Sequence, residues 1–260
     1  MDKIEVKILN PEVIRESEKM MVCCARLTQK GHGIKNMEDF MALYNKSYKD
    51  STVQVMTHLP HPTIQKFGVI NIVVVGASRR FLAQITRHEN EVKFMSASCQ
   101  YSDYSGNADF VVPYDIFDDP EAEKAYFNAC HEAQEHYEGA IKTGIGHDDA
   151  AYMLPQGLRN ILVISATPFQ WKHMIGQRVC NRNSKETQFV MLKCWEALYN
   201  EAPEFFSLDT TGPFCMRGPC KEGKMSCGRP IAKDMTPTDI LQQEFPKIYR
   251  KYAYTFGDEK

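Results

Sequence analysis

The sequence predicts an α+β fold in which helices flank a central sheet. Three short runs rich in β-branched residues have the length and composition of strands, at residues 3–9, 69–75 and 158–166. The longer segments between them repeat their apolar residues with the helical period. A chain of 260 residues, 43% of them hydrophobic, can bury a sizeable core in one large domain or two small ones.

The N-terminal elements are marked by their boundary residues. Isoleucine and valine alternate along residues 3–9, as in a strand with one buried face. Asn10-Pro11 is typical of a helix start, and that helix is expected to run to about residue 30, before a Gly-His-Gly turn. Asn36 is expected to cap a second helix over residues 37–48.

A buried strand and a short helix follow in the middle of the chain. The apolar run at 69–75 lies between Gly68 and Gly76 and suits a buried strand. Residues 79–88 return to the helical period and lead into a polar loop.

The second half of the chain is mostly helical before its last segment. Pro120 begins a long amphipathic helix, which Gly144 ends. Helices are further expected over 148–153, 168–178 and 183–199, with the third strand at 158–166. Past Pro203 the composition shifts to Gly, Pro and Cys, which predicts an irregular tail. We therefore expect a main domain over residues 1–206 and an extension packed on it over residues 207–260.

Charge and cysteine content narrow the class of protein. The formal net charge is −2, so nothing points to nucleic acid or a membrane surface as a partner. No apolar run is long enough to span a bilayer, and the N-terminus resembles a strand, not a signal peptide. Nine cysteines without a secretory signal indicate reduced thiols in the cytoplasm.

Residues 76–104 hold the densest group of candidate ligand-binding side chains. Gln84 lies one helical turn before Arg87 and His88, on the same face. Small hydroxyl and amide side chains follow, at Ser96, Ser98, Gln100, Tyr101 and Ser102. Arginine offers a planar fork to phosphate, and Ser and Gln offer neutral hydrogen bonds, so the set suits a phosphorylated, planar, polar ligand. The ordinary alternative is a solvated helix C-terminus, where cations favour the helix dipole.

This segment resembles the signature of the flavin-dependent thymidylate synthases. The family pattern is Arg-His-Arg, seven residues and then Ser; here Arg87-His88-Glu89 is followed by eight residues and Ser98. Residues 148–155 are similar to the family's acidic, Ala-Arg, Leu-Pro element, and counting on from there places Arg178 at the family's pyrimidine-binding Arg. His61 and Thr63 match a third element, in which Lys66-Phe67 replaces Glu-His. The resemblance covers about residues 3–206.

The departures from the family pattern cluster at ligand positions. Glu89 and Gln100 stand where the family has Arg, and Ala151 replaces an Arg that reaches phosphate from a neighbouring subunit. Thr167 and Phe169 replace the Asn and Arg of a flavin contact, and His173 replaces a further Asn. Each charge-assisted bond to phosphate contributes roughly 1.5–3 kcal/mol, so these losses should weaken the site unless other cations substitute. The sequence offers Arg79, Arg80, Lys93 and Arg182 for that role.

The resemblance implies a fold, a reaction and a set of site residues. The sheet should be largely antiparallel, and the chain should form a homotetramer whose sites combine residues of several subunits. The reaction implied is C5 methylation of the uracil in dUMP, with FAD as cofactor and with methylenetetrahydrofolate and NADPH as co-substrates. Arg178 is the catalytic candidate, since a cation near a pyrimidine carbonyl stabilises charge on the activated ring. Substrate contacts are implied for Gln84, Arg87, Ser98, Cys99, Gln100 and Arg178, and flavin contacts for Arg87, His88, Glu89, Ser96 and His173.

Three functions remain open at this point. The chain is a working thymidylate synthase with a variant site, a family enzyme for another pyrimidine nucleotide, or a catalytically impaired paralogue that serves as a binding subunit. The lost arginines favour the last two, and the retained Arg87-His88, Ser98 and Arg178 favour the first two. No metal site is expected, because Cys215, Cys220 and Cys227 lack the close pair of common zinc sites and an evident fourth ligand.

Overall fold

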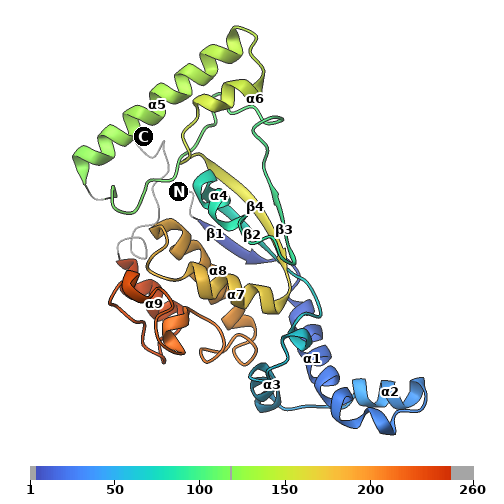
Figure 1. Ribbon diagram of the computed structural model, residues 1–260. Coiled ribbons are helices and arrows are strands. Elements are labelled where there is room, and N and C mark those ends of the chain that lie inside the picture. The colour runs from blue at the N-terminus through green and yellow to red at the C-terminus, as the bar shows by residue number, and fades with distance from the viewer. Residues whose placement is uncertain (1–3, 118, 247–260) are drawn as a thin grey trace.

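A four-stranded antiparallel sheet forms the centre of the computed structural model, which describes residues 4–117 and 119–246 (Figure 1). The strands are β1 (Glu5–Ile8), β2 (Ile70–Ser78), β3 (Val92–Ser96) and β4 (Arg159–Ala166), in the order β1-β2-β4-β3. All three pairings are antiparallel. The predicted α+β class with a largely antiparallel sheet is confirmed.

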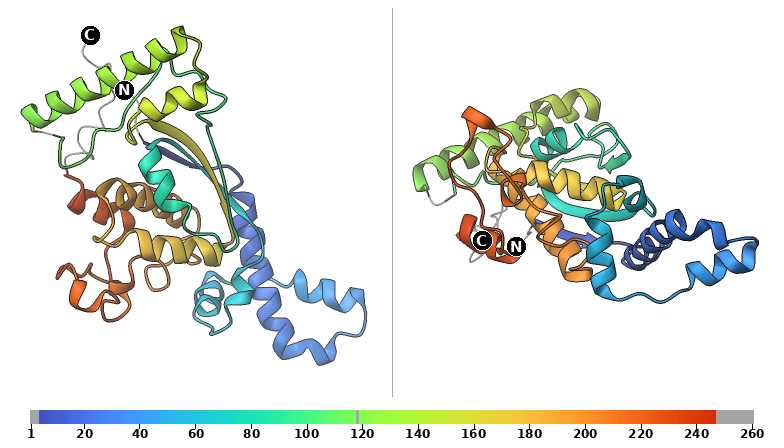
Figure 2. Two further views of the ribbon diagram at one scale, coloured as in Figure 1. Left: turned by 45° about the horizontal axis from the view of Figure 1, so that its top comes forward. Right: turned by 60° about the horizontal axis from the view of Figure 1, so that its bottom comes forward.

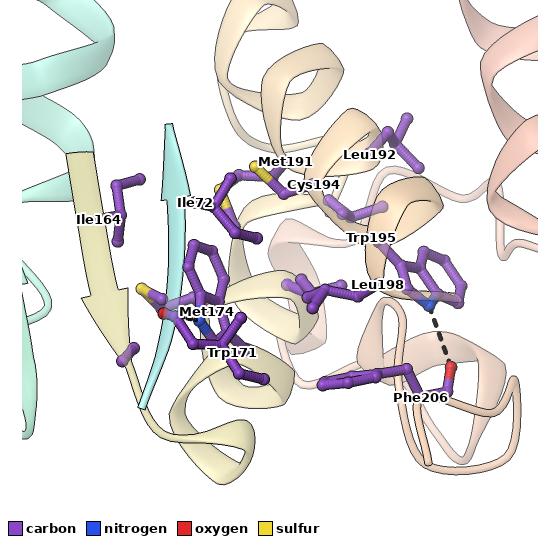
Figure 3. Close-up of a cluster of buried hydrophobic side chains, with 14 of the residues drawn as sticks. Ile72, Ile164, Trp171, Met174, Met191, Leu192, Cys194, Trp195, Leu198 and Phe206 are labelled. Carbon is purple, nitrogen blue, oxygen red and sulfur yellow. Dashed lines mark hydrogen bonds between the residues drawn. The ribbon is translucent and has the colours of Figure 1, made fainter. Parts of the chain in front are cut away.

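One face of the sheet carries the core. Because side chains alternate along a strand, Ile70, Ile72 and Val74 of β2 are fully buried on this face. They lie beneath α4 (Arg79–Ile85), α7 (Pro168–Arg178) and α8 (Lys185–Glu201). Figure 3 shows Trp171 and Trp195 packed in this layer, where both are fully buried. Their indole nitrogens donate hydrogen bonds to backbone oxygens at 3.1 and 3.3 Å, so burial leaves neither one unpaired.

The opposite face of the sheet is open in this chain. Val75, Met95 and Ile161 point to it and are 37%, 74% and 52% exposed. Val75 pairs directly with Ile161 across the strands, so these two side chains adjoin. The strand predicted at 69–75 is therefore buried on one face of the sheet and partly exposed on the other in the single chain.

A β-bulge sets the start of α4. The register of β2 against β4 shifts between Val75 and Ala77, and Gly76 between them has φ +87°, a conformation that side chains disfavour. Ser78 then caps α4 by accepting a hydrogen bond from the amide of Phe81 at 3.1 Å. Ser78 also donates to the carboxylate of Glu186 from its hydroxyl (2.5 Å) and its amide (2.6 Å), which ties α4 to α8.

Helical segments extend from both ends of the sheet layer (Figure 2). At one end lie α1 (Glu12–Lys30), α2 (Met37–Tyr44) and α3 (Asp50–Thr57). At the other, α5 (Pro120–Lys142) packs with α6 (His147–Ala150) over a separate small core around Tyr137. Single 3-10 turns occupy Gly31–Gly33, Pro62–Gln65, Ala151–Met153, Phe214–Met216 and Gly223–Met225. No helix in the described part of the chain is long and apolar enough to cross a membrane.

Three predicted elements need correction. The helix expected over 37–48 ends at Tyr44, and α3 begins separately at Asp50 after a polar stretch. The segment expected to be a polar loop contains β3, in which Val92 and Phe94 face the core while Lys93 and Met95 face out. The irregular tail contains α9 (Pro237–Glu244), begun by a capping box of Thr236 and Asp239.

The C-terminal segment shares the main core. Ile240, Leu241 and Phe245 are fully buried in the same hydrophobic cluster as the sheet, and α9 packs on α8. Figure 2 shows this segment lying along α7 and α8. Part of the predicted extension, residues 247–260, lies outside the described residues, and the division at residue 206 stays a prediction.

Candidate functional site

A hydrogen bond between His88 and Arg178 forms the centre of the candidate site. His88 follows α4, where its amide donates to Ile85 O at 3.1 Å, and Arg178 is the last residue of α7. Arg178 Nε lies 2.9 Å from His88 Nε2. A guanidinium can only donate, so His88 Nε2 accepts and the ring proton sits on Nδ1. The site thus contains a histidine with a fixed tautomer.

The surroundings of His88 keep its ring neutral. The side chain is buried, and burial first, followed by the charges of Arg178 and His173, lowers its pKa from 6.5 to about 4. The His173 ring stands edge-on to it at 5.9 Å between centroids. Within the described residues the His88 side chain has no hydrogen bond besides the one from Arg178. Its Nδ1–H is therefore a donor available to a ligand.

Arg178 is oriented by a residue that the sequence analysis missed. Its terminal nitrogen donates to Asn183 Oδ1 at 3.3 Å, and the Asn183 amide donates to the carbonyls of Gln177 (2.8 Å) and Cys180 (3.0 Å). Asn183 thus fixes the turn between α7 and α8 and the direction of the guanidinium. The polar residues that follow α7 in the sequence indicated a turn that contains Asn183, but the contact of Asn183 with Arg178 depends on the fold.

Two further predicted residues adjoin this pair. Arg87 is exposed and makes no hydrogen bond or ion pair with the described residues. Its charge lies close enough to lower the pKa of Arg178, after the larger effect of burial. Two guanidinium groups without an acidic partner favour an anion between them. His173 lies one turn before Gln177, and its Nε2 is 3.0 Å from the Gln177 amide nitrogen.

Gln84 links α4 to α8. Its Oε1 accepts hydrogen bonds from Thr187 (2.7 Å) and Ser184 (3.3 Å). The amide nitrogen of Gln84 has no partner among the described residues and can donate to a ligand. The contacts of Gln84 Oε1 thus join the two helices, and its predicted role in ligand binding stays a prediction.

The second group of predicted residues lies elsewhere in the chain. His88 precedes β3, whereas Ser98, Cys99 and Gln100 follow it, and four steps along a strand span about 13 Å. The segment after β3 runs toward α6, away from α7 (Figure 1). Ser98 Oγ accepts from the Gln100 amide at 3.1 Å, a local turn contact. The structure does not bring this group, or Ser96 within β3, to Arg178 in one chain.

Some of the substituted positions make contacts within the fold. Thr167 caps α7 by accepting from the Gln170 amide at 3.3 Å. Lys66 Nζ lies 5.4 Å from the Phe169 ring centroid and 2.8 Å from Glu91. Glu89 is exposed and forms no ion pair within the described residues, so neither Lys93 nor Arg182 neutralises it.

A cavity of about 660 Å³ adjoins Arg178. It lies between the end of α7 and the C-terminal segment, and Arg182 also lines it. Four thiols face it, those of Cys180, Cys215, Cys220 and Cys227. Burial raises the pKa of Cys180 above that of an ordinary thiol. Across residues 4–117 and 119–246 no three His, Cys, Asp or Glu side chains are arranged to hold a metal ion.

Known proteins share this sequence pattern and this architecture. The family model described as thymidylate synthase complementing protein matches residues 12–204. A flavin-dependent thymidylate synthase of Geobacter sulfurreducens is 22% identical over 215 residues, which cover 82% of this chain and 90% of the relative. One of Pyrococcus abyssi is 28% identical over 183 residues, 66% of this chain and 75% of the relative.

Solved structures share the fold at low sequence identity. A UMP/dUMP methylase, PolB of Streptomyces cacaoi, superposes with a TM-score of 0.64 at 15% identity, over 79% of this chain and 94% of that one. Thymidylate synthase X of Helicobacter pylori, solved with FAD and dUMP, superposes with a TM-score of 0.59 at 16% identity, over 78% of this chain and 97% of that one. The chain therefore belongs to the thymidylate synthase complementing protein family, whose curated members include the flavin-dependent thymidylate synthases and whose enzymes are methyltransferases.

Proposed function

We propose that this protein methylates C5 of the uracil ring of dUMP in an FAD-dependent reaction. Methylenetetrahydrofolate is the proposed carbon donor and NADPH the proposed reductant. The observation that carries the proposal is the neutral His88 ring held by Arg178 beside an unpaired Arg87, in a chain of this family.

The charges of the site suit a pyrimidine nucleotide. Arg87 is free of partners in the described chain, so it can bind a phosphate without first breaking an ion pair. Arg178 uses Nε and one terminal nitrogen internally, and its second terminal nitrogen is left to donate to a ring carbonyl. A cation fixed there stabilises the negative charge that develops when the ring is activated at C5.

The same residues fit a flavin. A flavin dinucleotide has ring carbonyls that accept hydrogen bonds and phosphates that need cations, and its bound form supplies the hydride that reduces the transferred carbon. His88 Nδ1–H and the Gln84 amide are unpaired donors in the described chain, and Arg87 is an unpaired cation. The chain's own residues would thus bind and orient the ring and hold its phosphates.

We also propose that a second copy of the chain completes the site. The group at Ser98, Cys99 and Gln100 follows β3 and the group around His88 precedes it, so one copy does not present both to one small ligand. The exposed apolar side chains of Val75, Met95 and Ile161 on the open sheet face support assembly, because such patches commonly mark interfaces.

A different pyrimidine nucleotide is the second candidate substrate. Glu89, Gln100 and Ala151 stand where three arginines are expected, which weakens the case for an unmodified dUMP site. PolB, a methylase of both UMP and dUMP, shares the fold, so acceptance of the ribose 2′-hydroxyl occurs on this architecture.

Titration with FAD and FMN tests the proposal. Purified protein is expected to be yellow, or to take up FAD at high micromolar concentration with a shift of the flavin spectrum. Calorimetry with dUMP and UMP on the flavin-loaded protein then ranks the two nucleotides. A colourless protein that gives neither heat nor a spectral shift with either flavin would contradict the flavoenzyme proposal and favour an impaired paralogue.

A further inference from the structure

A loop over residues 98–107 depends on one helix for its position. This 98–107 loop follows β3 and carries three of the predicted substrate contacts, Ser98, Cys99 and Gln100. Other hydrogen bonds of the loop join its own residues to one another. Within the described chain, every hydrogen bond from the loop to another helix or strand ends on Tyr137 or Glu138 of α5. These two side chains therefore anchor the loop.

Tyr137 holds two consecutive loop residues with one hydroxyl. Its Oη accepts a hydrogen bond from the Tyr104 amide at 3.1 Å and donates to Asp103 Oδ1 at 3.3 Å. His147 of α6 lies on the same oxygen, with Nδ1 at 3.2 Å. The ring is fully buried and stands edge-on to the Tyr104 ring, with 6.5 Å between centroids. Because burial fixes the ring, the hydroxyl is a rigid anchor for this part of the loop.

Glu138 supplies a second anchor close to the first. Its Oε1 accepts from the Gly106 amide at 2.9 Å and from the Gln134 side chain at 3.0 Å. These two bonds, the one from Gly106 first, lower the pKa of Glu138, so the acceptor is ionised at neutral pH. A charged acceptor makes a stronger hydrogen bond than a neutral one. The loop is thus held at residues 103, 104 and 106.

Tyr104 connects these anchors to the substrate contacts. Burial raises the pKa of its hydroxyl, and the neighbouring Cys99 thiol raises it further, so the two side chains adjoin. Both also pack on the small apolar cluster around Phe110. Because Cys99 lies between Ser98 and Gln100, fixing Tyr104 limits the movement of the backbone from which all three side chains project.

We propose that Tyr137 and Glu138 are positioning residues for the nucleotide site, which hold the 98–107 loop so that it presents Ser98, Cys99 and Gln100 to the substrate. This role rests on the proposed function, because those three side chains are substrate contacts only in a chain that binds a pyrimidine nucleotide. Neither positioning residue contacts the ligand, and each acts through the loop backbone. Order in the free loop lowers the entropic cost of binding.

Hydrogen exchange of the ligand-free protein tests the anchoring without any nucleotide. Tyr137→Phe keeps the buried ring and removes the hydroxyl. Peptides from the 98–107 loop should then exchange about three- to tenfold faster, the range expected for one lost hydrogen bond. Tyr126→Phe is the matched control on the same helix, because its hydroxyl donates to Val111 O at 2.7 Å, outside the loop. The control should leave exchange in the loop unchanged.

A pair of substitutions at Glu138 tests the second anchor in the same way. Glu138→Ala removes the acceptor of the Gly106 amide and should also speed exchange in the loop. Glu138→Gln keeps a side-chain oxygen at that place and should retain the slow exchange of the parent protein.

Calorimetry on the flavin-loaded proteins tests the consequence for the substrate. The probe is whichever of dUMP and UMP binds the parent protein more tightly. Its affinity should fall about three- to tenfold in Tyr137→Phe and in Glu138→Ala. The affinity for FAD should stay the same, because the predicted flavin contacts lie outside the loop. A general loss of structure would weaken both ligands, and circular dichroism and the thermal midpoint establish that each variant is folded.

The outcomes separate this role from the proposed function. Unchanged exchange in the loop, undiminished nucleotide binding, or equal weakening of FAD in a folded Tyr137→Phe would overturn the positioning role while the parent protein still binds its nucleotide. Should Tyr137→Phe fail to fold, Glu138→Ala decides by the same criteria. If the parent protein binds neither dUMP nor UMP, the proposed function fails, and the positioning role fails with it.

Discussion

Substituting Arg178 by lysine removes the geometry of its guanidinium while keeping its charge. In the structure Arg178 makes two hydrogen bonds in different directions, from Nε to His88 at 2.9 Å and from a terminal nitrogen to Asn183 at 3.3 Å. A lysine ammonium is a point charge on a flexible stem and cannot hold both acceptors and a ligand carbonyl in one plane. We expect Arg178→Lys to fold and to bind or turn over the pyrimidine nucleotide at least tenfold less well.

The magnitude follows from one lost charge-assisted hydrogen bond. Such a bond contributes roughly 1.5–3 kcal/mol, and a tenfold loss corresponds to about 1.4 kcal/mol, the lower end of that range. Arg178 is half-buried and lines a cavity of about 660 Å³, so lysine fits the space without overpacking. A surface arginine without a role would give a change within about 0.5 kcal/mol.

Calorimetry of dUMP binding and the thermal midpoint on the same samples separate the two effects. Arg15→Lys, an exposed arginine on α1, is the matched control and should change neither. If Arg178→Lys binds dUMP as tightly as the parent protein at equal stability, Arg178 is outside the site and the reasoning from its contacts is refuted.

Three further predictions concern His88, Glu89 and assembly. The pKa of His88 is about 4 in the folded chain and near 6.5 in the unfolded chain, so the unfolded chain binds this proton first as the pH falls, and the free energy of unfolding should decrease between pH 6.5 and 4. Denaturation of the parent protein and of His88→Gln should show that the variant lacks this pH-dependent component, and equal pH profiles would contradict the prediction. Glu89→Arg should strengthen dUMP binding about 1.5- to 5-fold at low ionic strength, since an exposed charge pair contributes about 0.2–1 kcal/mol; unchanged or weaker binding would show that Glu89 does not face the phosphate. Light scattering should give a mass well above the 29.8 kDa monomer, and a monomer at micromolar concentration would argue against a site shared between copies.

Local patterns in the sequence were sufficient for most of the fold. The alternation along β1, the β-branched run of β2, the cap at Asn36 and the helix-starting Pro120 predicted elements that the structure contains. β3 was missed because its outward Lys93 and its terminal Ser96 made a five-residue strand resemble a polar loop. In the tail, glycines and prolines dominated the composition and obscured the capping box at Thr236 that begins α9.

The candidate site was less accessible to sequence reasoning, because it depends on contacts between distant residues. His88 and Arg178 are 90 positions apart, and the packing of α4 and α7 on α8 brings one within hydrogen-bond distance of the other. A lysine on a helix is usually solvated, whereas Lys172 on α7 is buried. Its hydrogen-bond partner, Gln65, comes from a turn 107 positions earlier in the sequence. Residue types alone do not show that a charge is buried without an acid.

Release of tritium from dUMP labelled at C5 tests the central claim most directly, because methylation at C5 must displace the hydrogen there. With FAD, NADPH and methylenetetrahydrofolate present, the protein should release tritium to water and form a methylated nucleotide of the same stoichiometry. Release should depend on the flavin and fall at least tenfold in Arg178→Lys. If the flavin-loaded protein releases no tritium from dUMP or from equally labelled UMP, the account of this chain as a pyrimidine methylase is contradicted.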